Sequence, residues 1–395
     1  MKMHTRLNSW PLWLTGMGTA ALLSACGGGS GGDATTGSVR LAVTDAPACG
    51  YDHVYVTVNA VKFHQSPDAT DTDAGWQTLA LGGTPQRIDL LDLTNGLLQE
   101  LGQTILPTGT YTQMRLVLAP NSSAPYANAA VPTGGTETAL TTPSAQSSGL
   151  KLATRFTVTP GQLTDLVLDI DACKSIVTAG QSGHLNLKPV MSVFPRILTG
   201  MAVDGYVSNA SPYTAVSLQL NGQVVRSTVP DAQGYFALPY LPTTGAAYDL
   251  VITAPDRVTQ VLRSVPVLSS DITHVSTVGN PVALSAGASS TLSGGITSVA
   301  SSYEGEVTVR QAISATDQVE VTSRPVDAAT GTFSYTLDTT APQTASYVAA
   351  PALPTWTSYS DSAGQFSVVR TVNGVTLQTL PADLRSGPTS VNFDQ

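Results

Sequence analysis

The chain has 395 residues and a formal net charge of −9, and 11% of its residues are charged whereas 42% are hydrophobic. Its lysines and arginines are few and scattered, so the composition excludes the basic surface on which nucleic-acid binding depends. Abundant β-branched residues with frequent glycine and proline indicate short strands joined by turns, and the length allows two to four domains. The expected fold class is mostly β, with tandem antiparallel β-sandwich domains.

The first residues follow the pattern of an export signal. Lys2 and Arg6 precede an apolar stretch at 10–23 that carries no charge. A secretory signal has this order of a positive region, an apolar region and small residues before the cleavage site. A transmembrane anchor is the alternative, but about 14 apolar residues are fewer than the roughly 20 needed to cross a bilayer.

The apolar stretch ends in Leu23-Ser24-Ala25-Cys26, which resembles a bacterial lipobox. The resemblance implies a signal peptide at 1–25 and several acyl chains, such as palmitate, on Cys26; firm anchoring requires more than one chain. A plain signal peptide without lipidation is the alternative. The Gly/Ser-rich segment at 26–36 is then a flexible tether. By analogy with the sorting of known lipoproteins, Gly27 after the cysteine favours the outer membrane if the cell is Gram-negative. We therefore expect a cell-envelope lipoprotein that faces the periplasm or the surface.

The cysteines predict a disulfide. Lipidation of Cys26 leaves only Cys49 and Cys173, and export places this pair in an oxidising compartment. A Cys49–Cys173 disulfide would close a loop of more than a hundred residues, which stabilises a fold by about 4–5 kcal/mol in the chain-entropy account. Two buried free thiols are the alternative.

The segment 37–196 is predicted to be the first domain. Apolar and polar residues alternate along most of its expected strands, as in half-buried β-structure. We expect a short helix around 97–101, a helical turn at 174–177 and a long loop at 120–148 that is rich in Pro, Ala, Ser and Thr. The expected strands are 39–43, 54–63, 76–81, 87–90, 111–118, 150–158, 163–170 and 185–193.

Two further β domains are predicted at 200–285 and 290–395. Asn221-Gly222 lies between apolar runs and predicts a hairpin turn. A pattern of Asp, small residues, Gly, any residue and Phe occurs at 231–236, 327–333 and 361–366. In this pattern Asp bonds its own backbone, Gly takes a positive φ, and Phe enters the core. The repetition indicates β-sandwich modules with similar turns.

Five segments of the first domain together resemble a known family. They are VTDAP at 43–47, YDHVYVT at 51–57, IDLLDLTNG at 88–96, GTYTQMRL at 109–116 and LKPV at 187–190. Their order and spacing resemble the bacterial lipoprotein family catalogued as domain of unknown function 4382 (DUF4382). The resemblance implies an exported lipoprotein with a β-rich domain and brings no catalytic residues.

The second domain is similar to carboxypeptidase-regulatory-like sandwiches at 205–207, 231–236 and 241–250. That fold group includes carbohydrate-binding modules, which implies a glycan role by analogy. Stacking aromatic side chains on one face would support this role, although core packing is the other use for such residues. The candidates are Tyr206, Tyr213, Tyr235 and Tyr240.

Carboxylates near the strand ends of the first domain are the candidates for chemistry. Oxygen ligands from loops suit Ca²⁺, and the tentative calcium ligands are Asp45, Asp52, Asp89 and Asp92. Asp68, Asp71 and Asp73 form a second acidic cluster, and Asp169 and Asp171 complete the set. Paired carboxylates also serve glycosidases. Turn capping is the alternative for all of them.

A formal G-x-S-x-G occurs at 28–32, but the strand before it and the helix after it that a hydrolase nucleophile needs are not expected there. No phosphate-binding loop, dinucleotide fingerprint or kinase signature occurs in the sequence. We therefore predict a non-catalytic envelope lipoprotein that acts in binding, adhesion or scaffolding, with no cofactor apart from the tentative Ca²⁺. Its expected partners are the membrane, through the lipid, and a glycan or an envelope protein, but no nucleic acid. The alternatives are a carbohydrate-binding module protein and a carboxylate-dependent hydrolase.

Overall fold

The computed structural model describes residues 35–45, 50–81, 85–142, 148–180, 183–197, 200–211, 213–243, 245–297, 303 and 305–394. Over these residues the chain is nearly all β and forms several separate sheets, which confirms the predicted fold class. The main buried apolar side chains form three clusters, within 39–187, 203–345 and 292–393. None of the helices in the described ranges is long and apolar enough to cross a membrane.

The first domain packs a four-stranded sheet against a nine-stranded one. The smaller sheet has the order β13-β10-β1-β5, and the larger runs β11-β12-β8-β7-β2-β6-β9 with β3 and β4 paired to β2. Phe63, Tyr111 and Phe156 pack their rings together in the core. The strands are β1 (Thr36–Asp45), β2 (Tyr51–His64), β3 (Gln77–Ala80), β4 (Gln86–Asp89), β5 (Gln99–Pro107), β6 (Gly109–Leu118), β7 (Ala129–Pro132), β8 (Thr138–Thr141), β9 (Leu150–Val158), β10 (Leu163–Asp171), β11 (Ile176–Thr178), β12 (Leu185–Leu187) and β13 (Val190–Pro195).

The prediction of a short helix around 97–101 is wrong. A 3₁₀ turn, η1 (Leu90–Leu93), occurs earlier, because the Asp89 carboxylate accepts a hydrogen bond from the Leu91 amide and caps it. Asn95 and Gly96 both have positive φ, at 57° and 75°, and redirect the chain. β5 then begins at Gln99, so the leucines of this segment alternate along a strand rather than sharing a helical face.

Two other predictions for this domain are corrected. The loop predicted at 120–148 contains the paired strands β7 and β8. Asn121 holds them, since its side-chain amide donates to the carbonyls of Asn128 and Leu140, a constraint that composition does not reveal. The strand predicted at 185–193 is divided into β12 and β13 at Pro189, which has no amide hydrogen for a ladder.

The second module has two sheets, ordered β17-β14-β20, with β21 paired to β14, and β16-β15-β18-β19-β26-β27. Asn221 and Gly222 form the predicted turn with φ of 53° and 70°. β26 runs parallel to β19, so part of the sequence predicted as the third domain completes the second. The strands are β14 (Ala202–Ser208), β15 (Ala215–Leu220), β16 (Gln223–Thr228), β17 (Tyr235–Leu238), β18 (Tyr248–Ala254), β19 (Arg257–Val265), β20 (Ile272–His274), β21 (Val282–Ala283), β26 (Gln343–Ser346) and β27 (Thr357–Ser358).

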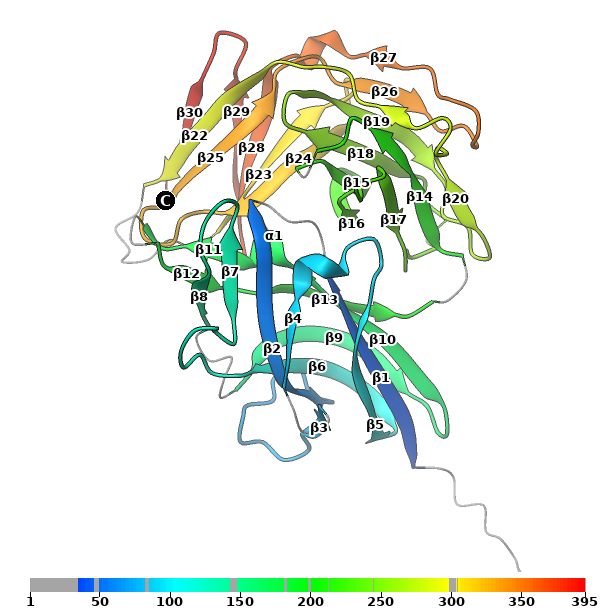
Figure 1. Cartoon of the computed structure of the whole chain (residues 1–395), viewed down its shortest axis with the longest axis vertical. Coiled ribbons are helices and arrows are strands. Elements are labelled where there is room, and N and C mark those ends of the chain that lie inside the picture. Colours follow the sequence, from blue (N-terminus) through cyan, green and yellow to red (C-terminus); the bar gives the residue numbers. More distant parts are fainter. Residues whose placement is uncertain are drawn as a thin grey trace, which may run out of the picture.

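The third module packs the sheet β25-β22-β30 against β24-β23-β28-β29. The repeated turns end as predicted, because Phe236, Phe333 and Phe366 are all buried. Figure 1 shows the first domain at one end of the molecule and the other two modules beside each other at the opposite end. The strands are β22 (Ser289–Ile296), β23 (Glu306–Ala312), β24 (Gln318–Pro325), β25 (Thr332–Asp338), β28 (Gln365–Val372), β29 (Val375–Asp383) and β30 (Thr389–Phe393).

Two glycines in similar hairpin turns allow two causes of instability on substitution to be distinguished, namely backbone strain and the loss of a contact between modules. Gly222 and Gly374 each follow an asparagine and have φ of 70° and 76°. A Cβ on Gly222 would meet the Gln318 carbonyl oxygen at 2.4 Å, whereas one on Gly374 would meet nothing within 4 Å. Gly374→Ala is expected to cost about 1 kcal/mol through φ alone, and Gly222→Ala clearly more. Thermal unfolding of both variants measures this, and equal losses would contradict the contact.

Candidate functional site at the three-domain junction

A one-turn helix, α1 (Ala172–Ser175), follows β10 and lies where the three modules meet. Its formation confirms the predicted helical turn, shifted by two residues. The Asp171 carboxylate caps it by accepting from the Lys174 amide at 2.9 Å. The buried Asp45 carboxylate accepts from the Ala172 amide at 3.0 Å. These carboxylates satisfy amides that a helix start leaves unpaired, and they fix the direction in which Lys174 extends.

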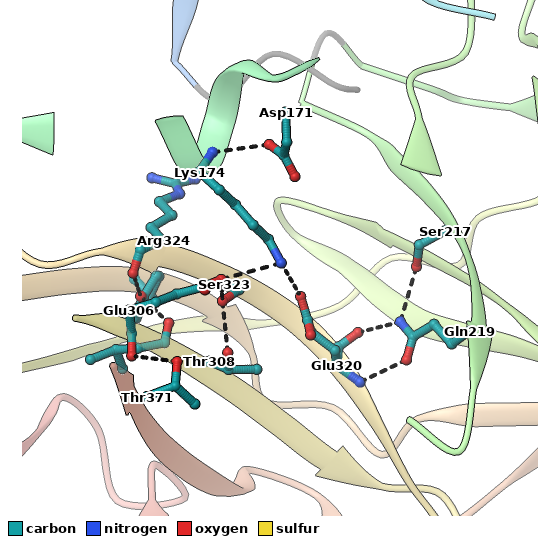
Figure 2. Close-up of polar contacts among 12 residues, drawn as sticks. Asp171, Lys174, Ser217, Gln219, Glu306, Thr308, Glu320, Ser323, Arg324 and Thr371 are labelled. Carbon is teal, nitrogen blue, oxygen red and sulfur yellow. Dashed lines mark hydrogen bonds and ion pairs between the residues drawn. The ribbon is translucent and has the colours of Figure 1, made fainter. Parts of the chain in front are cut away.

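Lys174 carries a charge from the first domain into the third. Its Nζ lies 3.2 Å from Glu306 Oε1 on β23 and 3.3 Å from Glu320 Oε1 on β24, as Figure 2 shows. Burial favours the neutral amine, but Glu320, Glu306 and Asp171 outweigh it and raise the pKa of Lys174. Burial raises the pKa of Asp171 to about 6 and also raises that of Glu320. The ammonium therefore stays charged and the carboxylates depend on it.

The second module joins this cluster through Gln219 on β15, whose side chain is fully buried. Its carbonyl oxygen accepts from the Glu320 amide at 2.9 Å, and its amide nitrogen donates to the Glu320 carbonyl at 2.8 Å. The same nitrogen donates to Ser217 Oγ at 3.0 Å. Gln219 thus pairs with β24 as a neighbouring strand would (Figure 2). We call Lys174, Gln219, Glu306 and Glu320 the junction cluster.

A second contact joins the first and second modules through Asn95. Its side-chain oxygen accepts from the Ala237 amide and from Thr228 Oγ1, both at 3.0 Å. Nearby, the Arg226 guanidinium lies 3.6 Å from the Phe194 ring centroid and 3.8 Å from Asp169. Burial raises the pKa of Asp169, and Arg226 opposes this. The turn in the DUF4382-like motif at 88–96 therefore serves as a docking point.

A third contact joins the first and third modules through Asp327, the first residue of a repeated turn. Its carboxylate accepts from the Gly180 amide at 2.8 Å and from Thr178 Oγ1 at 2.9 Å. The Ala328 amide donates to the Thr178 carbonyl at 2.9 Å. Burial of Asp327 is outweighed by its hydrogen bonds from Thr330, Gly180 and Thr178, so its pKa is lowered and it stays ionised.

Two cavities flank α1. The larger, about 680 Å³, lies between the first and third modules, and the smaller, about 470 Å³, is lined by all three. Cys173 and Arg324 line both cavities. Lys174 and Glu320 of the junction cluster line the smaller cavity and Asp327 lines the larger one, so these contacts between modules hold the cavity walls together.

The structure gives the four tentative calcium ligands separate contacts. Asp52 accepts from the Gly134 amide at 3.1 Å, and Asp89 accepts from the Val54 amide at 3.1 Å and lies 2.6 Å from His53 Nδ1. Asp45 caps α1 and Asp92 is exposed. Within the described ranges, no three His, Cys, Asp or Glu residues come together as a metal would require. The calcium hypothesis stays a prediction.

The second acidic cluster anchors a loop. Asp71 pairs with the Arg115 guanidinium, which also lies 4.6 Å from the Trp76 ring centroid. Asp73 accepts from the Thr70 amide at 2.9 Å, and this hydrogen bond lowers the pKa of Asp73. The contact of Asp73 matches the turn-capping alternative, whereas Asp71 forms an ion pair with a residue of β6.

The candidate tyrosines do not share one face. Tyr206 and Tyr235 have ring centroids 5.2 Å apart, but Tyr240 packs on Phe194 of the first domain at 5.6 Å. Tyr213 is 47% exposed and lines the smaller cavity. Two of the four rings form a pair, and a third belongs to the contact between modules.

The predicted lipidation and disulfide sites are only partly within the description. Cys26 and Cys49 lie outside the described residues. Cys173 is buried at the junction, with 8% of its surface exposed, and it is disulfide-bonded. The pairing with Cys49 stays a prediction.

Sequence reasoning missed the junction cluster. Glu306 and Glu320 lie on strands β23 and β24, each of which carries one further charge, Arg310 or Arg324, in a chain in which only 11% of residues are charged. Charged residues are seldom buried unless they are paired, so a charge within such a strand is a signal for a partner. The identity of that partner, more than a hundred residues away, is not visible in local pattern.

Lys174→Met is expected to destabilise the protein by about 2 kcal/mol, because the neighbouring carboxylates lose their counter-charge in a partly buried site. Lys151→Met is the control, since Lys151 is exposed on β9. Chemical denaturation measures both variants. Adding Glu320→Gln to Lys174→Met should recover part of the loss, and equal stability of the two lysine variants would contradict the role of Lys174.

Comparison with known proteins identifies a family for the first domain only. No curated protein matches the chain. Among solved structures, a C-terminal interface mutant of a type II cohesin–X–dockerin complex from Acetivibrio cellulolyticus is 25% identical over 22% of this chain and 59% of its own, with a TM-score of 0.19. The Bacillus anthracis TIE protein is 11% identical over 91% of this chain and 51% of its own, with a TM-score of 0.17.

The major pilin SpaD from Corynebacterium diphtheriae is 9% identical over 91% of this chain and 96% of its own, with a TM-score of 0.17. This chain thus spans 59% of the length of the cohesin–dockerin chain, and similarities at these TM-scores carry no argument about function. The family described as "Domain of unknown function (DUF4382)" matches residues 36–189. The first domain is therefore a DUF4382 domain, as its motifs predicted.

Proposed function

We propose that the protein is a non-catalytic lipoprotein of the bacterial cell envelope that acts in binding, adhesion or scaffolding. The observation that carries this proposal is the use of the acidic residues near the strand ends. Asp45 and Asp171 hold α1, Asp89 caps η1, and Asp169 faces Arg226. Carboxylates with these structural partners are poorly placed to act as an acid–base pair on a substrate.

The proposal includes an anchored and cross-linked chain. Residues 1–25 are removed as a signal peptide, Cys26 carries the lipid, and the protein resides in the outer membrane. Support comes from the lipobox-like sequence Leu23-Ser24-Ala25-Cys26 and from the positive and apolar regions that precede it. With Cys26 lipidated, Cys49 is the partner left for the disulfide of Cys173.

Cell fractionation tests the anchor. The natural chain is expected in the membrane pellet, whereas a variant with an ordinary secretory signal and Cys26→Ser is expected in the soluble fraction, because it lacks the acyl chains. The intact mass of the soluble variant should rise by two hydrogens on reduction. Equal distribution of the two proteins would contradict lipidation, and an unchanged mass would contradict the disulfide.

The soluble Cys26→Ser protein then tests the binding role. Mixed with isolated cell envelopes and sedimented, it is expected to appear in the pellet and to release no soluble sugar or peptide fragments. Bovine serum albumin under the same conditions controls for trapping. Recovery entirely in the supernatant would contradict binding, and steady release of fragments would favour the carboxylate-dependent hydrolase instead.

A further inference from the structure

The larger cavity beside α1 is lined by many groups that can form hydrogen bonds. Strands β22, β25 and β30 of the third module form much of its wall, opposite Tyr51 of β2 and the residues around α1. A cavity of about 680 Å³ is within the range of small-ligand sites. Its side chains with hydroxyl or amide groups are Thr178, Ser293, Thr332, Ser334, Ser390 and Asn392.

Arg324 supplies a cation to this cavity. The other basic groups of the junction have acidic neighbours, as Lys174 has Glu306 and Arg226 has Asp169. No carboxylate of the described residues lies within 4 Å of the Arg324 guanidinium, and Arg324 is exposed. Figure 2 shows this guanidinium turned away from Glu306 and towards α1. A guanidinium in this state offers two parallel donors to a carboxylate.

Aromatic side chains stand beside the cation. Phe333 and Tyr335 on β25 have ring centroids 5.8 Å apart, and both line the cavity with Tyr51. Burial raises the pKa of Tyr51 and of Tyr335, and the charge of Arg324 opposes both shifts. Phe333 and Tyr335 are buried in the core of the third module, whereas Tyr51 is partly exposed and presents its ring to the cavity. An aromatic ring beside hydroxyl and amide groups suits a sugar ring with one apolar face and several polar edges.

We propose that this cavity binds an acidic saccharide, a sugar ring with one carboxylate, through the guanidinium of Arg324 and the hydroxyl and amide side chains of β22, β25 and β30. The inference rests on the proposed binding function and names its ligand class. Asp327 lines the same cavity and stays ionised, so a polyphosphate, with several negative charges, would meet more repulsion there than a single carboxylate paired with Arg324.

Ligand-observed NMR on the soluble full-length Cys26→Ser protein tests the proposal with D-glucuronate and D-galacturonate. Glucose and galactose are matched probes without the carboxylate. Both NMR and competition between the sugars should show at least tenfold weaker binding of the neutral sugars. Arg324→Gln should weaken binding of at least one uronate tenfold or more, Arg324→Lys should weaken it less, and Arg155→Gln, at an exposed position on β9, should leave it unchanged.

Three results would overturn the proposal. They are no binding of either uronate, equal binding of the neutral sugars, and unchanged uronate binding by an Arg324→Gln variant with normal thermal stability. Pyrophosphate binding tighter than that of the uronates would also overturn the ligand class. Sedimentation with cell envelopes remains a separate measurement, so loss of the saccharide site and loss of the general binding role are distinguishable.

Discussion

The placement of one charged side chain constrains how the three modules fit together. Lys174 lies on a single helical turn that Asp171 and Asp45 hold in place, and its ammonium is removed from most of the solvent at the junction. A charge in such a place requires partners, because desolvation without pairing is costly. Glu306 and Glu320 provide them from a different module, so the first domain cannot turn relative to the third without separating these charges.

Hydrogen bonds between the modules extend this constraint. Gln219 of the second module forms hydrogen bonds with the backbone of β24. Asn95 of the first domain accepts hydrogen bonds from Thr228 on β16 and Ala237 on β17. Asp327 of the third module accepts a hydrogen bond from Thr178 on β11. Lys174, Glu320 and Asp327 line the two cavities beside α1. A binding site with walls on separate modules needs such fixed geometry, since preorganisation lowers the entropy lost on binding.

The sequence predicted the features that depend on local pattern. The strands predicted at 39–43 and 54–63, the Asn221-Gly222 turn and the buried phenylalanines after the repeated turns are confirmed, because each depends on residues a few positions apart. The predictions failed where distant contacts decide. Asn121 organises β7 and β8, and β26 leaves the third module to pair with β19. The junction cluster belongs to this second kind, since Lys174 and its carboxylates are neighbours only in the folded chain.

The most direct test of the central claim is differential scanning calorimetry of the mature full-length protein. If the junction joins the three modules into one cooperative unit, the protein unfolds in a single transition in which the calorimetric and van't Hoff enthalpies agree. Two or three resolved transitions, each with its own midpoint, would show modules that unfold independently, and this would contradict the role of Lys174 and its partners in holding the modules together.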